Sequence, residues 1–279
     1  MKLKTLNIIG TGPGDPGLMP VKAIEALKKS SLVFYPEVPG GQGSLALATV
    51  KKALKKAGAA APPGKFVPLK VEMSRVNEGN ENLYARNALK VIEGLKSGAC
   101  SYITVGDPMF YSTFWGLYSE IKKTLSGKGG RRRAPAPSSA AGTDSGASPG
   151  VRLNVVSGIS SLNYALGLIG EPLVNKNSSV LITVPVNKGA SEIKKEISFI
   201  AEKNRNDGPN LIVFMKAGRY VKNIIGALKD SGRDDFKNGS LNVYLIEKSK
   251  LVEGFIGEEM SLGKGENFNY FSILIMVFS

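Results

Sequence analysis

The chain has 279 residues, with 37 Lys and Arg against 23 Asp and Glu and a net charge of +14. It contains no histidine and one cysteine, Cys100, which excludes Ser-His-Asp and Cys-His catalysis, histidine-ligated zinc and an intramolecular disulfide. We therefore predict Cys100 to be a small core residue. We expect no metal bound by the protein itself, and chemistry that works by positioning and electrostatics.

The excess of positive charge admits three kinds of partner: nucleic acid, an anionic membrane surface or a polyanionic small substrate. Most lysines follow helical patterns such as Lys51–Lys56, which leave one face apolar and one face wet, so we interpret them as solvated surface. No apolar run approaches the roughly 18–20 residues needed to span a bilayer. The first five residues lack the apolar stretch of a signal peptide, and we expect a cytoplasmic protein.

The first 125 residues alternate short apolar runs with amphipathic ones. They predict strands over 6–10, 32–35, 66–69 and 102–105, and helices over 20–29, 44–56, 80–96 and 113–124. Pro20 suits the first helical turn and Ser44 suits a helix N-cap. Strands that alternate with helices at this spacing indicate parallel βαβ units.

Residues 126–150 break this pattern. They are rich in Gly, Ala, Ser and Pro and contain no aromatic residue and no Leu, Ile, Val or Met. Such a segment buries too little surface to offset the entropy of ordering it, so we predict a flexible low-complexity insert. We interpret Arg131–Arg133 as solvated charges of this insert.

The pattern resumes after the insert. It predicts strands over 153–156, 180–184, 211–215, 241–247 and 271–277, and helices over 160–169, 192–202 and 221–229. The fold class is therefore α/β, with two α/β domains at residues 1–125 and 151–279. We expect the first sheet to be mainly parallel and the second to be mixed because its later connections are short.

The first loop follows the first predicted strand with Gly12-Pro13-Gly14-Asp15-Pro16-Gly17, which formally satisfies G-x-G-x-x-G. A Rossmann loop binds pyrophosphate through backbone N–H groups at a helix N-terminus. Pro13 and Pro16 lack that donor, and Asp15 places a negative charge where phosphate would lie. We reject the dinucleotide interpretation, while a rigid turn built by Gly and Pro remains the alternative.

A second loop, residues 105–112 (VGDPMFYS), repeats Gly-Asp-Pro after another apolar strand. Gly106 would let a ligand approach the backbone closely, and Asp107 can anchor a turn or accept a hydrogen bond. Two such breaks in one α/β chain suggest a ligand cleft built from strand ends.

These loops resemble the signature loops of the tetrapyrrole (corrin/porphyrin) methyltransferases, which use S-adenosylmethionine. The family's mid-chain Pro-Gly-(Val/Ile)-Ser/Thr-Ser/Ala segment is matched by Ser157–Ser161, with Ser157 in place of the usual Pro. Met215 matches the Met that follows a later strand, and Glu247–Ser249 matches a late strand-end segment. The resemblance covers nearly the whole chain except residues 126–150. It implies a cleft between the two domains that holds the donor, and a homodimer.

Finer features resemble the members that methylate C-20 of precorrin-2, or of its cobalt complex, in cobalamin biosynthesis. Asp107–Phe114 matches Asp-Pro-x-x-Tyr-Ser-Thr-Phe, and Met215–Arg219 matches Met-Lys-x-Gly-Arg. Met73–Val76 matches Met-Ser/Thr-Arg-Asp, with Val76 replacing the usual Asp.

The resemblance also implies positions for the site residues. Those expected to contact S-adenosylmethionine, many through their backbones, are Pro13, Val105, Gly106, Asp107, Phe110, Ser160, Ser161, Met215 and Ser249. Those expected to contact the tetrapyrrole are Gly12, Asp15, Arg75, Arg86 and Arg219, with an ordinary surface or structural role as the alternative for each Arg. Tyr111 would hydrogen-bond the macrocycle or help remove its meso proton, with a packed core Tyr as the alternative. We expect Asp107→Ala to weaken donor binding more than it alters folding.

The sequence also admits other functions. A sibling enzyme would act on uroporphyrinogen III or on another precorrin position with the same fold and donor. An RNA methyltransferase of related fold would suit the net charge, but the basic residues are dispersed and no aromatic-interleaved basic stripe marks an RNA surface. We therefore expect a polyanionic tetrapyrrole as partner, and neither nucleic acid nor membrane. A non-catalytic interaction protein would leave both Gly-Asp-Pro loops without a purpose.

Overall fold

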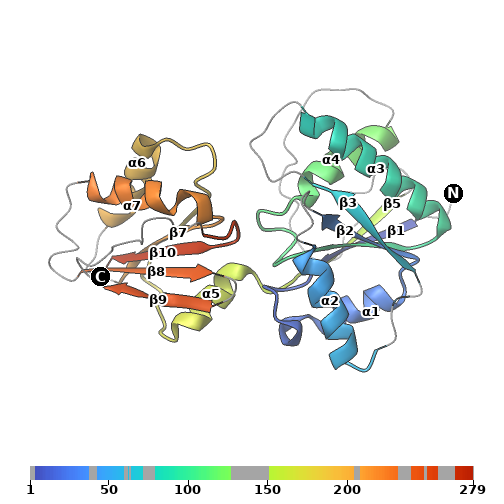
Figure 1. Ribbon diagram of the computed structural model, residues 1–279, viewed down its shortest axis with the longest axis horizontal. Coiled ribbons are helices and arrows are strands. Elements are labelled where there is room, and N and C mark those ends of the chain that lie inside the picture. The colour runs from blue at the N-terminus through green and yellow to red at the C-terminus, as the bar shows by residue number, and fades with distance from the viewer. Residues whose placement is uncertain are drawn as a thin grey trace. The chain divides into compact units, whose positions relative to one another are not determined.

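The computed structural model describes residues 4–37, 43–59, 62, 64–71, 79–126, 151–203, 208–231, 240–247, 250–256 and 268–278, of which 79–82 and 250–256 are described by their backbone alone. The chain divides into two compact units, Met1–Ser161 and Leu162–Ser279, each with its own sheet (Figure 1). Among the residues described, no helix is long and apolar enough to cross a membrane.

The sheet of the first unit has five parallel strands in the order β3-β2-β4-β1-β5. They are β1 (Lys4–Gly10), β2 (Leu32–Glu37), β3 (Lys65–Lys70), β4 (Cys100–Thr104) and β5 (Val151–Val156). The predicted strands at 6–10, 32–35, 66–69 and 102–105 are confirmed to within a few residues, and so is the parallel arrangement.

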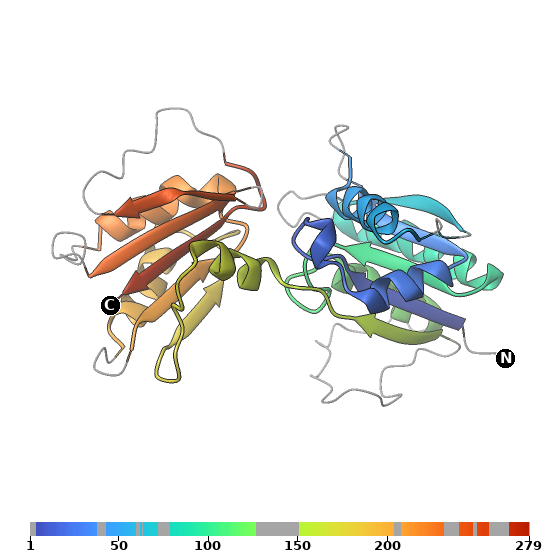
Figure 2. The same cartoon turned by 90° about the horizontal axis from the view of Figure 1, so that it is seen from below.

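Helices cover both faces of this sheet (Figures 1 and 2). On one face lie α1 (Val21–Lys28) and α2 (Leu45–Lys56), and on the other lie α3 (Gly79–Ser97) and α4 (Phe114–Ser126). Strand β1 supplies both cores, because Leu6 and Ile8 pack with α3 and α4 whereas Ile9 packs with α1 and α2. Cys100 is fully buried as predicted, and burial raises the pKa of its thiol to about 11.

The helix boundaries follow local signals in the sequence. Pro20 stands at the N-cap of α1, and the Ser44 side chain accepts a hydrogen bond from Leu47 N at the start of α2, as its position predicts. A short 3-10 helix, η1 (Pro16–Leu18), which was not predicted, fills the loop between β1 and α1.

Strand β5 differs from the expected domain organisation. The sequence placed it in a C-terminal domain that starts at residue 151, but β5 pairs with β1 in the first sheet, with Lys4 opposite Val151 and Ile9 opposite Val156. The units therefore divide between Ser161 and Leu162. Composition marks residues 126–150 as an interruption, yet composition does not reveal which strand the next segment pairs with. Residues 127–150 of the predicted insert lie outside the described residues.

The second unit has a mixed sheet, as expected, in the order β6-β7-β10-β8-β9. Its strands are β6 (Val180–Thr183), β7 (Asn210–Phe214), β8 (Leu241–Glu247), β9 (Lys250–Ile256) and β10 (Ile273–Phe278). Only β6 and β7 pair in parallel. Its helices are α5 (Ser161–Ile169), α6 (Ala190–Ala201), the 3-10 helix η2 (Gly218–Tyr220) and α7 (Val221–Lys229). Strand β9 was not predicted.

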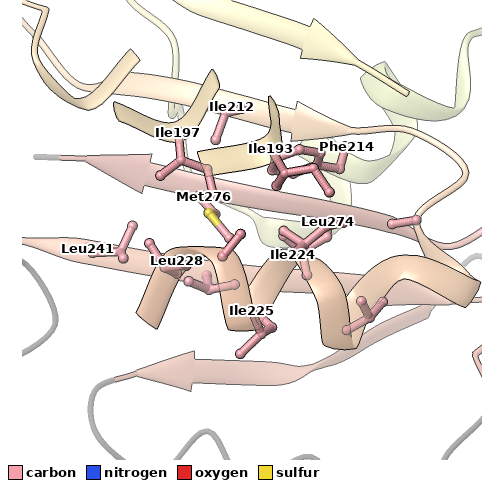
Figure 3. Close-up of a cluster of buried hydrophobic side chains, with 14 of the residues drawn as sticks. Ile193, Ile197, Ile212, Phe214, Ile224, Ile225, Leu228, Leu241, Leu274 and Met276 are labelled. Carbon is pink, nitrogen blue, oxygen red and sulfur yellow. The ribbon is translucent and has the colours of Figure 1, made fainter. Parts of the chain in front are cut away.

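Helices α6 and α7 pack on one face of the second sheet (Figure 2). Leu274 and Met276 of β10 are buried against Ile224 and Leu228 of α7 in the core that Figure 3 shows. Alternate residues of β7 and β10 enter this core, as expected for strands that are covered by helices on one face.

Candidate active site

The loops after β1, β4 and β5 meet at one edge of the first sheet. These strands are neighbours in the order β4-β1-β5 and run parallel, so their carboxyl ends lie together. The main chains of Gly10, Gly106 and Gly158 approach so closely there that neither Gly10 nor Gly158 leaves room for a Cβ. A Cβ added to Gly158 would lie 2.3 Å from the Gly106 carbonyl oxygen, and one added to Gly10 would lie 2.6 Å from the Gly158 nitrogen.

Backbone hydrogen bonds join the two Gly-Asp-Pro loops. Gly106 N donates to Gly12 O at 2.8 Å, and Gly12 N donates to Gly106 O at 3.3 Å, which makes an isolated antiparallel bridge. Beneath it, the backbone N of Thr11 donates to Thr104 O at 2.9 Å. The two Gly-Asp-Pro loops lie more than 90 residues apart in the sequence, and the fold of the first unit brings them together as predicted.

The Asp107 carboxylate connects the second loop to the third. Its Oδ1 accepts a hydrogen bond from Met109 N at 2.7 Å, and its Oδ2 accepts one from Gly158 N at 3.0 Å. Both oxygens are therefore engaged by main-chain amides, so Asp107 fixes its own turn and holds the β5 loop in place. The sequence suggested the turn but not the link to Gly158.

Asp15, the counterpart of Asp107 in the first loop, makes a more local contact. Its Oδ1 accepts a hydrogen bond from Gly17 N at 2.7 Å and caps η1. Asp15 is exposed, whereas Gly12 and Pro13 are buried. The predicted tetrapyrrole contacts Gly12 and Asp15 therefore lie on the same loop as Pro13.

Exposed aromatic and apolar side chains follow Asp107. Tyr111 has a φ of 50°, in the left-handed region that non-glycine residues rarely adopt, and its side chain is 42% exposed. The rings of Phe110 and Tyr111 meet edge to face with centroids 4.9 Å apart. Tyr111 is thus not a packed core residue, and its exposure leaves open the predicted role beside the macrocycle.

A buried tyrosine anchors the end of the same loop. Tyr102 Oη lies 3.2 Å from Thr113 Oγ1, at the start of α4, and burial raises the pKa of Tyr102 to about 12. Its phenol therefore stays neutral at physiological pH and serves as a hydrogen-bonding group within the core.

Ser160 and Ser161 lie at the start of α5, beside Gly106. A Cβ added to Gly106 would have Ser161 N, at 3.8 Å, as its nearest contact. Gly106 also has a φ of 72°. Unlike at Gly10 and Gly158, an added Cβ at Gly106 would make only an ordinary van der Waals contact. The predicted donor contacts Val105 and Ser161 lie next to Gly106, in the chain and in space respectively, and Ser160 precedes Ser161.

These residues fit a ligand such as S-adenosylmethionine. Gly106 has a left-handed backbone without a Cβ, and the main-chain N of Ser161 lies beside it, so the backbone here is accessible to close approach by small groups. S-adenosylmethionine carries a carboxylate, a sugar and an adenine, which such donors recognise without a catalytic histidine. The described residues hold no group of three or more Cys, Asp or Glu side chains that could bind a metal ion. That the protein binds no metal remains a prediction.

Arg86 is an exposed residue of α3, next to the end of β3. Its neighbour Asn87 donates from Nδ2 to Lys70 O at 2.8 Å, which places this part of α3 at the carboxyl end of β3. Arg75 lies outside the described residues, and so does Ser249.

In the second unit, Met215 and Arg219 follow the carboxyl end of β7. Met215 is buried and its N donates to Thr183 O at 2.8 Å, whereas Arg219 lies on η2 and is exposed. Lys216, between them, has a φ of 58°. Lys216 belongs to the Met-Lys-x-Gly-Arg motif, but no sequence signal marks a left-handed lysine. The cleft expected between the two domains remains a prediction.

The sequence of this chain is similar to those of known methyltransferases. A family model described as Tetrapyrrole (Corrin/Porphyrin) Methylases matches residues 5–128. The Probable cobalt-precorrin-2 C(20)-methyltransferase of Methanocaldococcus jannaschii is 26% identical over 267 residues, which cover 89% of this chain and 98% of that protein. The Precorrin-2 C(20)-methyltransferase of a Sinorhizobium species is 26% identical over 232 residues, or 81% of this chain and 79% of that protein.

Solved structures share the fold. A cobalt precorrin-4 methyltransferase superposes with a TM-score of 0.56 at 13% identity, over 98% of this chain and 94% of that one. The uroporphyrin-III C-methyltransferase of Thermus thermophilus, complexed with S-adenosyl homocysteine, gives 0.54 at 20% identity, over 98% and 96%. Residues 5–128, which include the two bridged Gly-Asp-Pro loops, thus match the tetrapyrrole (corrin/porphyrin) methylase family, and the similarity to the two C(20)-methyltransferases extends over most of the chain.

Proposed function

We propose that this protein transfers a methyl group from S-adenosylmethionine to C-20 of precorrin-2, or of its cobalt complex, in cobalamin biosynthesis. One observation carries the proposal. The likeness to the C(20)-methyltransferase of Methanocaldococcus jannaschii extends over 98% of that protein and includes both units of this chain, beyond the residues that the family model matches.

S-adenosylmethionine supplies a methyl group that its sulfonium already activates, so the protein's task is to orient the donor and acceptor and to exclude water. The first unit is suited to this task because rigid glycine contacts and two amide-bound Asp107 oxygens fix its strand-end loops. Val105, Gly106, Ser160 and Ser161 would hold the donor, with Pro13 and Phe110 beside them. From the second unit, Met215 would contribute.

The acceptor is a macrocycle with several carboxylates. The net charge of +14 favours its approach through electrostatic steering, and the exposed Arg86 and Arg219 offer guanidinium groups that pair well with carboxylates. We assign Tyr111 to the acceptor as well, because its ring is exposed and its backbone is held in a rare conformation. A cytoplasmic homodimer without a nucleic acid or membrane partner completes the proposal.

The test is an anaerobic incubation of the purified protein with S-adenosylmethionine and precorrin-2, with and without cobalt, in which the mass of the tetrapyrrole is followed. We expect a gain of one methyl group per acceptor, and the cobalt requirement will identify the true acceptor. No gain, with S-adenosylhomocysteine still bound, would contradict the assigned acceptor while leaving the donor site intact.

A further inference from the structure

A chain of hydrogen-bonded polar side chains crosses the first sheet. Asn154 Nδ2 of β5 donates to Asn7 Oδ1 of β1 at 2.8 Å, and Asn7 Nδ2 donates to Ser101 Oγ of β4 at 3.3 Å. Ser101 Oγ lies 2.6 Å from Ser30 Oγ, which itself donates to Ala26 O of α1 at 2.8 Å. The chain therefore links β5, β1 and β4, the three strands whose carboxyl ends carry the candidate site, to α1.

The three side chains within the sheet stand directly opposite one another. Asn7 is paired with Ser101 on one side and with Asn154 on the other. Asn7 and Ser101 are buried, with exposed fractions of 5% and 0%. A buried amide that loses its partner destabilises the fold, so this layer favours the one register in which Asn154 faces Asn7. A single buried asparagine sets the register of coiled coils by the same physics.

The apolar side chains of β5 do not distinguish this register from a shifted one. Val151 and Leu153 pack on the core beneath α3 and α4. A shift of β5 by two residues would bring Leu153 and Val155 to these two places, which preserves the apolar pattern. The same shift would bring Val156, which has no side-chain donor, opposite the buried Asn7.

The position of β5 in the fold adds little constraint of its own. The strand stands at the end of the order β3-β2-β4-β1-β5. In hairpins a tight turn fixes the register, but residues 127–150 separate β5 from α4, and a connection of this length leaves the register open. The polar pair therefore supplies information that neither the core nor the connection provides.

The register of β5 places the loop that follows it. A parallel strand advances by about 3.3 Å per residue, so a two-residue shift would move this loop by about 7 Å. Gly158 N would then leave Asp107 Oδ2, to which it donates at 3.0 Å. Ser161 N, which lies beside Gly106, would be displaced with it.

We propose that Asn7 and Asn154 are positioning residues for the donor site, because their pairing sets the register of β5 against β1. The donor contacts that depend on this register are Ser160 and Ser161. The inference rests on the proposed function, since S-adenosylmethionine is the ligand that these serines would hold. Neither asparagine touches the donor, and both act through the main chain of β5.

The test separates positioning from stability. Asn154→Leu removes one partner and leaves Asn7 Oδ1 without its donor, whereas the double variant Asn7→Leu/Asn154→Leu replaces both amides by apolar groups of similar size. Asn87→Leu is the control, because Asn87 is also buried in the first unit but donates to Lys70 O, away from β5. Stability is measured by urea denaturation, affinity for S-adenosylhomocysteine by calorimetry, and the opening of β5 by amide hydrogen exchange.

We expect Asn154→Leu to lose both stability and affinity. The double variant should unfold near the wild-type urea midpoint, since removing both partners of a buried polar pair costs little. Its dissociation constant for S-adenosylhomocysteine should still rise about tenfold, because only part of the population has the native register. The amides of β5 and of residues 158–161 should exchange faster. Asn87→Leu should lose stability without losing affinity.

A double variant that binds S-adenosylhomocysteine as the wild type does, with unchanged exchange in β5, overturns the inference and leaves the proposed function intact. Affinity that merely follows stability through all three variants also overturns it, because a structural role alone would give that result. A wild-type protein that does not bind S-adenosylhomocysteine overturns the proposed donor site, and the positioning role with it. Exchange rates in β5 then still show whether the asparagine pair sets the register.

Discussion

The carboxyl ends of β1, β4 and β5 in the first sheet are held by different interactions from the carboxyl ends of β6 and β7 in the second sheet. At the edge of the first sheet, the contacts run through the main chain: the Gly12–Gly106 bridge, the packing of Gly158 and two amides bound to Asp107. At the edge of the second sheet, ionic side chains dominate, with the Lys188–Glu196 pair and the Lys216 ammonium over Tyr270. The structure of the first edge therefore depends on close main-chain packing, and that of the second on charged side chains. Substitutions at the two edges should therefore change stability by different amounts.

The largest effect is expected for Gly158→Ala. The new Cβ would lie 2.3 Å from the Gly106 carbonyl oxygen and 2.8 Å from Gly10 C, and backbone atoms cannot move aside as a flexible side chain can. We expect a loss of at least about 3 kcal/mol in the free energy of unfolding, measured by urea denaturation, together with loss of S-adenosylhomocysteine binding.

Gly167→Ala is the matched control for Gly158→Ala. Gly167 lies on the exposed side of α5, and an added Cβ would have nothing within 4 Å. Since Gly weakens a helix interior, we expect a gain of about 0.5–1 kcal/mol. Equal and small effects of the two substitutions would refute the close contact of the three loops.

A smaller effect is expected for Asp107→Ala. Two amides, of Met109 and Gly158, would lose a charged acceptor, so we expect about 2 kcal/mol of lost stability in urea denaturation, with weaker S-adenosylhomocysteine binding as a consequence. This revises the expectation from sequence that donor binding would suffer more than folding, because the carboxylate already serves the main chain.

Asp15→Ala is the control for this position. Asp15 occupies the same place in the first Gly-Asp-Pro sequence, but the hydrogen bond that its side chain accepts within the described part of the chain comes from Gly17 N, in its own turn. We expect a clearly smaller loss of stability than for Asp107→Ala. The opposite order would show that the link between the β4 and β5 loops contributes nothing.

The smallest effect concerns the charged edge of the second sheet. A double-mutant cycle with Lys188→Met and Glu196→Gln should give a coupling energy of about 1 kcal/mol, because the pair is about three-quarters buried and is also linked to Thr183. The coupling should fall in 1 M salt. A coupling near zero at low salt would show that the Lys188–Glu196 pair does not stabilise the charged edge of the second sheet.

Much of the fold could be predicted from the sequence because its signals are local. Apolar runs mark β1 and β4, and Ser44 marks the start of α2, each through interactions within a few residues. The pairing of β5 with β1 could not be predicted, since about 150 residues separate them and strand partners leave no local signal. Strand β9 was missed because Glu253 and Gly254 interrupt its apolar run.

In the candidate site, too, features with local sequence signals could be predicted and features that depend on distant contacts could not. The two Gly-Asp-Pro loops were recognisable because glycine and proline report backbone geometry directly. The bond from Asp107 to Gly158 and the left-handed conformation of Lys216 depend on contacts with distant strands. Such contacts emerge only from the folded chain.

The central claim, methyl transfer to C-20, is tested most directly by the position of the transferred carbon. The protein is incubated with S-adenosylmethionine labelled with carbon-13 in its methyl group and with precorrin-2 or its cobalt complex, and the product is examined by nuclear magnetic resonance. The account predicts one labelled methyl group bonded to C-20. A label on any other ring carbon, or no transfer to either acceptor, would contradict it.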